Sequence, residues 1–285
     1  MNIMNVILFL FSYCKFIPYQ FLFKLSSVCK GRNIFKSKKL KFSKLHVLLN
    51  IGDFIQYWIY MDGAYEVSFV RYFFDKYKKS KGVFIDVGAN LGTYSLNLVP
   101  CFEKIYAIEA SSSNASFIKT VLFQNQVKNV EVYQKAILDE DNKILTLTLS
   151  DFTCGCNSLY DKPTGKEEQV QTITLDTIWK QNNRLNVRFL KIDIEGAEWG
   201  CVQGGKEMIS CCHPDVWCEF NSESAHQAGY SLVDLYNYFI DRGYKAYTLK
   251  PITRFWRGCG CSMKPFDFEK ISTDNFFGNI LFIYS

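Results

Sequence analysis

The segment at 83–95, VFIDVGANLGTYS, constrains the fold of this chain more than any other. Val83–Val87 is apolar apart from Asp86, which predicts a buried strand, and the glycines that follow predict a turn into a helix beginning near Gly92. Glycine allows a ligand to come close and adopts backbone angles that a β-carbon penalises. The free N–H groups of the helix face the same turn. The segment therefore predicts a ligand-binding turn at the end of a strand.

A carboxylate ends the next apolar strand. Glu109 closes the run KIYAIE at 104–109, 23 positions after Asp86, which suits an acid that binds the two hydroxyls of a ribose. A dinucleotide fold requires Gly-x-Gly-x-x-Gly, whereas this chain has GANLG, with Asn90 in place of the second glycine. Asp86 would repel a pyrophosphate but could accept a hydrogen bond from an ammonium group. The local chemistry therefore favours S-adenosylmethionine over NAD.

These motifs resemble those of the FkbM-type S-adenosylmethionine-dependent methyltransferases. Three stretches carry the resemblance in the family's order: DVGANLGTYS at 86–95, AIE at 107–109 and LKIDIEGAE at 190–198. The resemblance runs from about residue 50 to the C-terminus. It departs at Ala110-Ser111, where the family usually has a proline, so the loop beside the adenine is expected to differ in shape. The resemblance implies a Rossmann-like class I methyltransferase that methylates oxygen on a sugar, a glycan or another small acceptor.

Alternating strands and helices from Val83 onward predict an α/β fold with a mostly parallel, seven-stranded sheet and helices on both faces. A β-hairpin insert, Lys143–Leu149 and Val170–Leu175, is expected to carry a loop at Ser150–Gln169 that flanks the acceptor. One amphipathic helix at Tyr65–Tyr77 should precede the sheet, with Tyr65 or Glu66 partly covering the cofactor. The seven expected strands are Val83–Val87, Ile105–Glu109, Val130–Lys135, Val187–Ile194, Asp215–Phe220, Tyr244–Leu249 and an antiparallel Gly278–Tyr284.

The expected cofactor site lies at the carboxyl ends of these strands, where open α/β sheets bind ligands. The turn from Asp86 to Gly92 should hold the methionine part of the cofactor, Glu109 the ribose, and Ala136 with Ile137 the adenine. The complete set of expected cofactor-binding residues is Asp86, Gly88, Ala89, Asn90, Gly92, Ser95, Glu109, Ala110, Ala136 and Ile137.

The expected catalytic residues lie at the ends of the next two strands. Alternation places Asp193 and Glu195 on one side of their strand, and a carboxylate among like charges can act as a base. Glu219 ends the following strand. His226 lies in a polar segment expected to overhang the acceptor, where an imidazole could take a proton from a hydroxyl. No metal is expected, although the same carboxylates could instead hold a divalent cation.

Charge divides the chain into two parts, which we interpret as an N-terminal segment at 1–49 and a methyltransferase domain at 50–285. Residues 1–52 carry nine Lys or Arg and no Asp or Glu, whereas the remainder carries 24 basic and 28 acidic residues. The acidic body gives no electrostatic case for a nucleic-acid partner.

The apolar run at 1–23 is broken by Lys15 and Pro18, so it suits neither a spanning helix nor a signal peptide. Residues 1–44 either lie on an anionic membrane surface or pack on the domain beside a solvated basic loop. Eleven scattered cysteines without CxxC pairs predict a reducing, cytoplasmic compartment. Two alternative functions stay open: methylation of nitrogen, a lipid or a polyketide by the same fold, and a non-catalytic binding module with the methyltransferase fold at a membrane surface.

Overall fold

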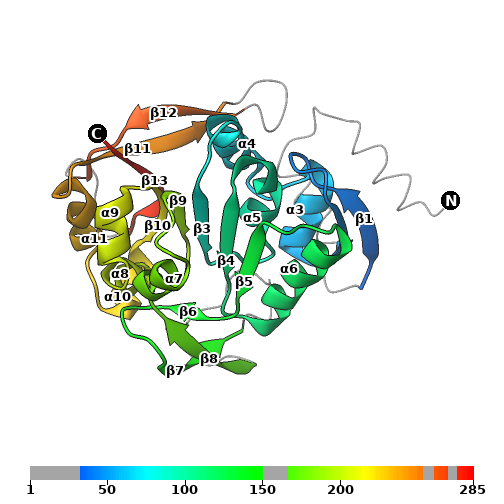
Figure 1. Ribbon diagram of the computed structural model, residues 1–285, viewed down its shortest axis with the longest axis horizontal. Helices are drawn as coiled ribbons and strands as arrows, with labels where there is room; N and C mark the ends of the chain where they lie inside the picture. The colour runs from blue at the N-terminus through cyan, green and yellow to red at the C-terminus, as the bar shows by residue number, and fades with distance from the viewer. Residues whose placement is uncertain (1–32, 150–158, 160–165, 253–259, 269–274) are drawn as a thin grey trace.

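The computed structural model describes residues 33–149, 159, 166–252, 260–268 and 275–285. An eight-stranded sheet runs through the centre of the molecule in the order β12-β11-β13-β10-β9-β3-β4-β5 (Figure 1). The five strands from β10 to β5 are parallel, and β13, β11 and β12 add to them in antiparallel pairs. The strands are β3 (Val83–Val87), β4 (Lys104–Ile108), β5 (Val130–Tyr133), β9 (Val187–Ile192), β10 (Asp215–Asn221), β11 (Tyr244–Pro251), β12 (Cys261–Pro265) and β13 (Phe277–Tyr284).

The Rossmann-like α/β fold is confirmed, and the sheet has one strand more than the seven expected. The additional strand, β12, pairs with the outer edge of β11. Four of its five residues are exposed. An edge strand with exposed side chains lacks the alternation of apolar and polar residues by which a strand is recognised, which explains why the sequence did not indicate it.

Helices cover both faces of the sheet, and neighbouring residues of one strand contribute to opposite layers of the core. In β3, Phe84 packs with one layer and Ile85 with the other, as the period of two in a strand requires. The layer around Ile85 contains α7 (Leu175–Gln181), α8 (Glu198–Gln203), α9 (Lys206–Cys212), α10 (Ser222–Ala228) and α11 (Leu232–Ile240). The layer around Phe84 contains α3 (Phe54–Asp62), α4 (Val67–Tyr77), α5 (Thr93–Asn97), the 3₁₀ turn Val99–Cys101 and α6 (Ser112–Gln124).

The first two described strands, β1 (Phe35–Lys39) and β2 (His46–Asn50), form an antiparallel hairpin. Val47 and Leu49 of this hairpin are buried in the same core layer as Phe84. The expected division between residues 49 and 50 falls at the end of β2, and it stays a prediction. Residues 1–32 of the expected N-terminal segment lie outside the described residues.

Helix α3 was not expected from the sequence. Asp53 caps its N-terminus by accepting a hydrogen bond from the Gln56 amide at 2.9 Å. Its buried residues include the consecutive Tyr57, Trp58 and Ile59, so the helix lacks the single apolar stripe that marks an amphipathic helix. Within the described ranges, no helix is long and apolar enough to span a bilayer.

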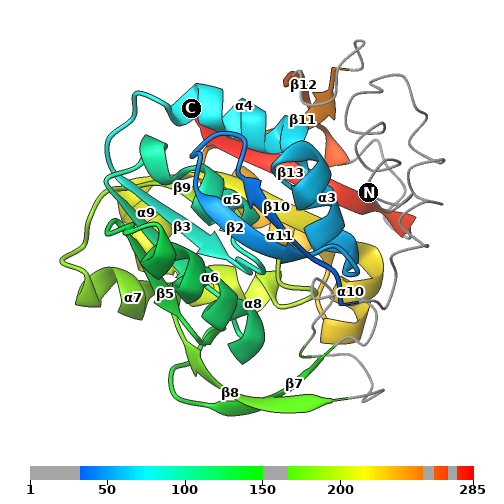
Figure 2. The same ribbon diagram turned by 90° about the vertical axis from the view of Figure 1, so that its right-hand side faces the viewer.

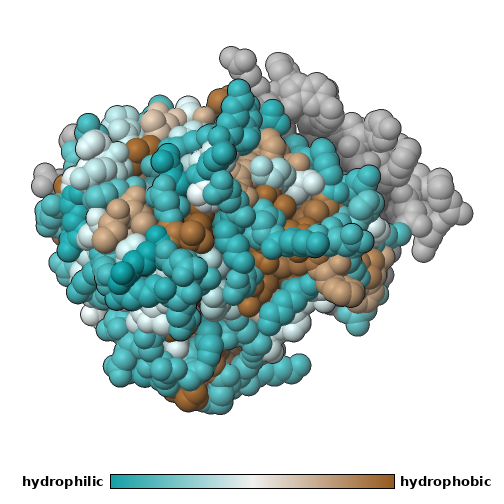
Figure 3. All heavy atoms as spheres, viewed as in Figure 1, coloured by the Kyte–Doolittle hydropathy of each residue, from teal (hydrophilic) through white to brown (hydrophobic). Residues whose placement is uncertain are grey.

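The expected β-hairpin insert is present as β7 (Ile144–Thr148) and β8 (Glu167–Ile173), which pair antiparallel. The end of the expected third strand forms a separate short strand, β6 (Ala136–Ile137), which pairs with β8. Figure 2 shows this small sheet projecting below the main sheet, and the described face in Figure 3 is mostly hydrophilic around patches of apolar side chains. Of the loop expected to flank the acceptor, 150–158 and 160–165 lie outside the described residues.

Candidate active site

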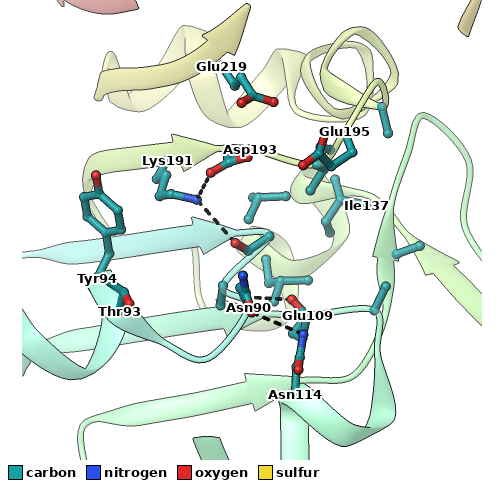
Figure 4. Close-up of a pocket in the computed structure, with 18 of the residues that line it drawn as sticks. Asn90, Thr93, Tyr94, Glu109, Asn114, Ile137, Lys191, Asp193, Glu195 and Glu219 are labelled. Carbon is teal, nitrogen blue, oxygen red and sulfur yellow. Dashed lines mark hydrogen bonds and ion pairs between the residues drawn. The ribbon is translucent and has the colours of Figure 1, made fainter. Parts of the chain in front are cut away.

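A cavity of ≈ 390 Å³ lies at the carboxyl ends of β3, β4, β9 and β10. Its lining comes from the turn after β3, from the ends of β4 and β9, from the β6–β7 sheet, from β13 and from the segment that joins α3 to α4. Figure 4 shows Asn90 and Glu109 on one side of this space and Asp193, Glu195 and Glu219 on the other. The cavity therefore has two halves: a cofactor half beside Asn90 and Glu109, so named for the cofactor expected there, and an acidic half beside Asp193, Glu195 and Glu219.

The glycine turn is held against the turn that follows β9. Gly88 has a φ of +74°, and a β-carbon there would lie 1.8 Å from the backbone oxygen of Asp193. The Asp193 amide donates to the Val87 carbonyl at 3.2 Å. Asn90 also has a positive φ, of 52°, which asparagine tolerates better than most residues. Only glycine fits at position 88, because both the space and the backbone angle exclude a side chain.

Glu109 lies at the end of β4 as a buried carboxylate at the edge of the cavity. Its Oε2 accepts from the Asn90 amide at 2.7 Å, and its Oε1 accepts from the Ser111 amide at 2.9 Å. Burial raises the pKa of Glu109 to about 7, against the lowering effect of these hydrogen bonds. The Asn114 side chain also hydrogen-bonds this carboxylate. A carboxylate has about four lone-pair sites, so part of this capacity remains for hydroxyl groups of a ligand.

The far wall of this half is apolar. Ala136 and Ile137 of β6, together with Ala110 and Leu147, line the cavity beside Asn114 of α6. The separate strand β6 exists because Ala136 and Ile137 pair with Thr172 and Ile173 of the insert. The structure thus brings Ala110, Ala136 and Ile137 into the same cavity as Glu109, and their contact with an adenine stays a prediction. Ala89, after Gly88, also lines the cavity.

Asp86, Gly92 and Ser95 were expected to bind the cofactor directly, but they are not among the residues that line the cavity. Asp86 is buried, and its Oδ2 accepts from the Ser95 amide at 3.0 Å and the Ser95 hydroxyl at 2.6 Å. These bonds join β3 to α5, and Gly92 precedes that helix. Contact of Asp86 with an ammonium group of the ligand stays a prediction.

Lys191 connects the two halves. It is 4% exposed, and its Nζ lies 3.0 Å from Asp193 Oδ2, 3.8 Å from Asp86 Oδ1 and 3.3 Å from the carbonyl oxygen of Gly88. Burial would lower the pKa of Lys191, but Asp193 and Asp86 raise it above its ordinary value. Lys191 is therefore a fixed cation that orients Asp193.

The acidic half contains the three carboxylates expected to act in catalysis. Oxygen atoms of Asp193, Glu195 and Glu219 all lie within 4.8 Å of one another (Figure 4). Burial raises the pKa of Glu219 to about 10, and the charges of Asp193 and Glu195 contribute. Burial is the main cause, so Glu219 favours its neutral form more than an exposed carboxyl group does.

Glu198 fixes the turn that carries Asp193 and Glu195. It is 2% exposed and accepts from the amides of Ile194 at 3.0 Å and Gly196 at 3.1 Å. The Tyr230 hydroxyl donates to it at 2.8 Å. Burial raises the pKa of Glu198, and these hydrogen bonds lower it. The turn is therefore held from behind by a carboxylate that does not line the cavity.

His226 was expected to overhang the acceptor, and the structure corrects this. The side chain of Asn221 accepts from the amides of Glu223 and Ser224 and starts a helix, α10, where a loop was expected. His226 is exposed on that helix and does not line the cavity. The capping residue was visible in the sequence, since Asn is favoured at this position.

The sequence did not indicate several residues that line the cavity, and it indicated Tyr65 and Glu66 only as a partial cover of the cofactor. Glu66 and Tyr65 line the cavity, and Glu66 accepts a hydrogen bond from the Tyr94 hydroxyl at 2.8 Å. Burial, followed by the charge of Asp193, raises the pKa of Glu66. Asn279 lines the cavity because it pairs with Glu219 across β10 and β13. Such pairing joins residues 60 positions apart, and no local pattern predicts it.

Comparisons with known proteins agree with the motifs. The family described as "Methyltransferase FkbM domain" matches residues 49–246. No curated protein matches the chain.

Among solved structures, the methyltransferase FkbM from Methylobacillus flagellatus shares 18% identity at a TM-score of 0.44, covering 72% of this chain and 44% of that chain. The chain thus corresponds to less than half the length of that protein. An rRNA methylase from Streptococcus thermophilus shares 10% identity (TM-score 0.42, 79% and 95% covered). A SAM-dependent methyltransferase from Aquifex aeolicus shares 15% (TM-score 0.37, 76% and 91%).

Proposed function

The chain belongs to the FkbM methyltransferase family, and from that premise we propose that it transfers a methyl group from S-adenosylmethionine to a hydroxyl oxygen of a sugar, a glycan or another small acceptor. The observation that carries the proposal is that one cavity contains both the cofactor half, at Glu109, and the acidic half, at Asp193. The cofactor and the acceptor must meet in such a space, because the methyl group moves directly between them.

The cofactor half offers groups that fit S-adenosylmethionine. Glu109 keeps lone pairs for ribose hydroxyls, and Ala110, Ala136 and Ile137 provide an apolar wall for adenine. We assign the methionine part to the turn at Gly88, Ala89 and Asn90, beside Thr93 at the start of α5. The described lining includes five carboxylates and two lysines, a balance that favours a sulfonium over a pyrophosphate.

The acidic half supports oxygen as the acceptor atom. A hydroxyl is a weak nucleophile until it loses its proton, whereas a neutral amine needs no base. In the proposed reaction, a lone pair of the oxygen forms the new C–O bond, the C–S bond breaks with its electrons remaining on sulfur, and Asp193 or Glu195 takes the proton. Glu219 lines the same half, and its Oε2 has no hydrogen-bond partner among the described residues, so it would help to orient the acceptor.

Calorimetric titration with S-adenosylhomocysteine, with NAD as the control, tests the cofactor. We expect micromolar binding of S-adenosylhomocysteine alone; a folded protein that does not bind it would refute the methyltransferase activity and support a non-catalytic module. Transfer of a labelled methyl group to a panel of neutral sugars, sugar nucleotides, amines and lipids then tests the acceptor. Labelled amines or lipids in place of sugars would favour the alternative acceptors.

We also propose that the basic residues at 1–44 bring the enzyme to an anionic membrane surface. Nine Lys or Arg without an acid in residues 1–52 support this. Co-sedimentation with anionic and neutral vesicles tests it, comparing the full chain with a chain that begins at residue 33. A cut at residue 50 would be unsuitable because it removes Val47 and Leu49 from the core. Equal recovery of both chains with anionic vesicles would contradict the proposal.

A further inference from the structure

We propose that Asp193, Glu195 and Glu219 bind a divalent cation of the Mg²⁺, Mn²⁺ or Ca²⁺ class at the acceptor end of the cavity. All three side chains line the cavity, and Figure 4 shows them converging from the end of β9, the turn after it and β10. Carboxylate oxygens are the ligands that these cations prefer.

The spacing of the oxygen atoms fits such an ion. One carboxylate oxygen from each residue lies within 4.8 Å of the other two. Cation–oxygen bonds are about 2.0–2.1 Å for Mg²⁺ and about 2.3–2.6 Å for Ca²⁺, so two ligands of one ion lie at most about 4–5 Å apart. The three groups can therefore share one ion with small rotations of their side chains.

Glu219 provides a second observation that is separate from the clustering. It is only 8% exposed, and its Oε2 has no hydrogen-bond partner within the part of the chain that the structure describes. A buried polar atom without a partner is costly. The other buried glutamates of the site differ in this respect, because each oxygen of Glu109 and Glu198 accepts at least one hydrogen bond from a backbone amide or a tyrosine. Glu219 is thus placed to receive a ligand.

Lys191 does not fill this role. Its Nζ lies 3.0 Å from Asp193 and contacts Asp86 and the carbonyl of Gly88. Across the described residues, no ion pair reaches Glu219. Lys191 therefore does not supply a partner for Glu219.

The site is also built in advance. Glu198 holds the amides of Ile194 and Gly196, on either side of Glu195, and the Tyr230 hydroxyl supports Glu198. Glu195 itself has a φ of 51°, an angle that ordinary residues adopt only where the surroundings enforce it. A ligand that sits on a restrained turn loses less entropy when it binds a metal.

Only the use of the cation rests on the proposed function, not its binding. A bound cation would accept an oxygen of the acceptor in an open coordination position and lower the pKa of that hydroxyl. Acceptors that present two neighbouring oxygen atoms, such as a vicinal diol, could occupy two positions at once. The substrate class thereby narrows from hydroxyl compounds in general to chelating ones.

The test is titration of the full chain with Mn²⁺, without cofactor, followed by electron paramagnetic resonance of the free ion. We expect one saturable Mn²⁺ per chain, displaced by Mg²⁺ or Ca²⁺. Glu219→Gln keeps the side-chain volume and should weaken binding by about tenfold or more, or about 1.4 kcal/mol. Glu223→Gln, at an exposed glutamate four positions away on α10, is the matched control and should leave the affinity unchanged.

Absence of saturable binding at millimolar Mn²⁺, or binding that Glu219→Gln does not weaken, would overturn the inference. Thermal unfolding of each variant without metal verifies the fold, and Glu195→Gln provides a second variant. Titration with S-adenosylhomocysteine in the presence of a chelator separates this inference from the proposed function. Cofactor binding without Mn²⁺ binding would refute the cation alone, whereas loss of cofactor binding in a folded protein would refute the methyltransferase activity.

Discussion

Replacement of Glu109 by alanine tests the cofactor half most directly. The carboxylate accepts two backbone amides, at 2.7 and 2.9 Å, and its remaining lone pairs are assigned to the ribose. Loss of hydrogen bonds to a charged group typically costs about 1.5–3 kcal/mol, so Glu109→Ala should weaken S-adenosylhomocysteine binding by about 10- to 150-fold. Glu103→Ala, at an exposed glutamate before β4, is the matched control and should bind normally.

The pH dependence of binding gives a second readout of the same residue. Burial raises the pKa of Glu109 from 4.5 to about 7, so its protonated form adds stability to the empty protein at low pH, and that contribution is lost as the pH rises through 7. Cofactor binding has the opposite dependence, because hydroxyl donors favour the ionised carboxylate.

Calorimetry between pH 5.5 and 8 should therefore show affinity rising to a plateau above pH 7, with a loss of up to about tenfold for each pH unit below it. The slope should vanish in Glu109→Ala. Unchanged affinity in that variant, or the same slope in both proteins, would refute the ribose assignment.

Three further substitutions test the support of the site. Gly88→Ala should destabilise the fold by more than a left-handed backbone angle alone, which costs about 1–2 kcal/mol, because its β-carbon would meet the backbone oxygen of Asp193. Gly229→Ala is the control for backbone strain, since Gly229 has a φ of +77° and nothing within 4 Å of an added β-carbon. Equal urea midpoints for the two variants would contradict the clash. Lys191→Met leaves Asp86 and Asp193 without their cation and should cost about 3–5 kcal/mol of unfolding free energy. A loss below about 1 kcal/mol, the scale of an exposed ion pair, would show that the pair is solvated. Tyr230→Phe removes the hydroxyl that supports Glu198 and should lower kcat more than it weakens S-adenosylhomocysteine binding; an equal effect on both would show that Tyr230 acts through the fold.

The sequence predicted the strands and the residues at their ends. It did not predict features that depend on the direction of a side chain or on pairing between distant parts of the chain. The strands at 83–87 and 104–108, the glycine turn and the position of Glu109 follow from local patterns, and the structure has them. Asp86 was placed at the ligand because it precedes the turn, but its side chain points toward α5 and meets Ser95. His226 was placed in a loop because its neighbours are polar, whereas Asn221 begins a helix there.

The segment before the main sheet, residues 54–77, also shows that side-chain direction and long-range contacts limit what the sequence predicts. Its apolar residues at mixed spacing did not reveal α3, because Tyr57, Trp58 and Ile59 are all buried. Phe54 and Ile55 of this helix line the cavity. Which face of the sheet a preceding helix covers depends on contacts far along the chain, such as the packing of Phe69 and Phe73 against Trp217. The sequence therefore indicated a helix before the sheet, but it did not indicate α3 or the contribution of α3 to the cavity wall.

The charge around the cavity constrains the acceptor more than the shape does. The carboxylates that line it are Glu66, Glu109, Asp193, Glu195 and Glu219, against Lys135 and Lys191 among the described residues. Lys135 hydrogen-bonds Gln171 of β8, so Lys191 is the one lysine beside the acidic half in the part of the chain that the structure describes. A phosphate group of a sugar nucleotide would meet net negative charge there, at an energetic cost that low dielectric amplifies. Neutral sugars avoid that repulsion, and a cation on Asp193, Glu195 and Glu219 would remove it. The preference between a neutral sugar and its phosphorylated form consequently depends on whether the carboxylates hold a cation, which links the choice of acceptor to the metal site.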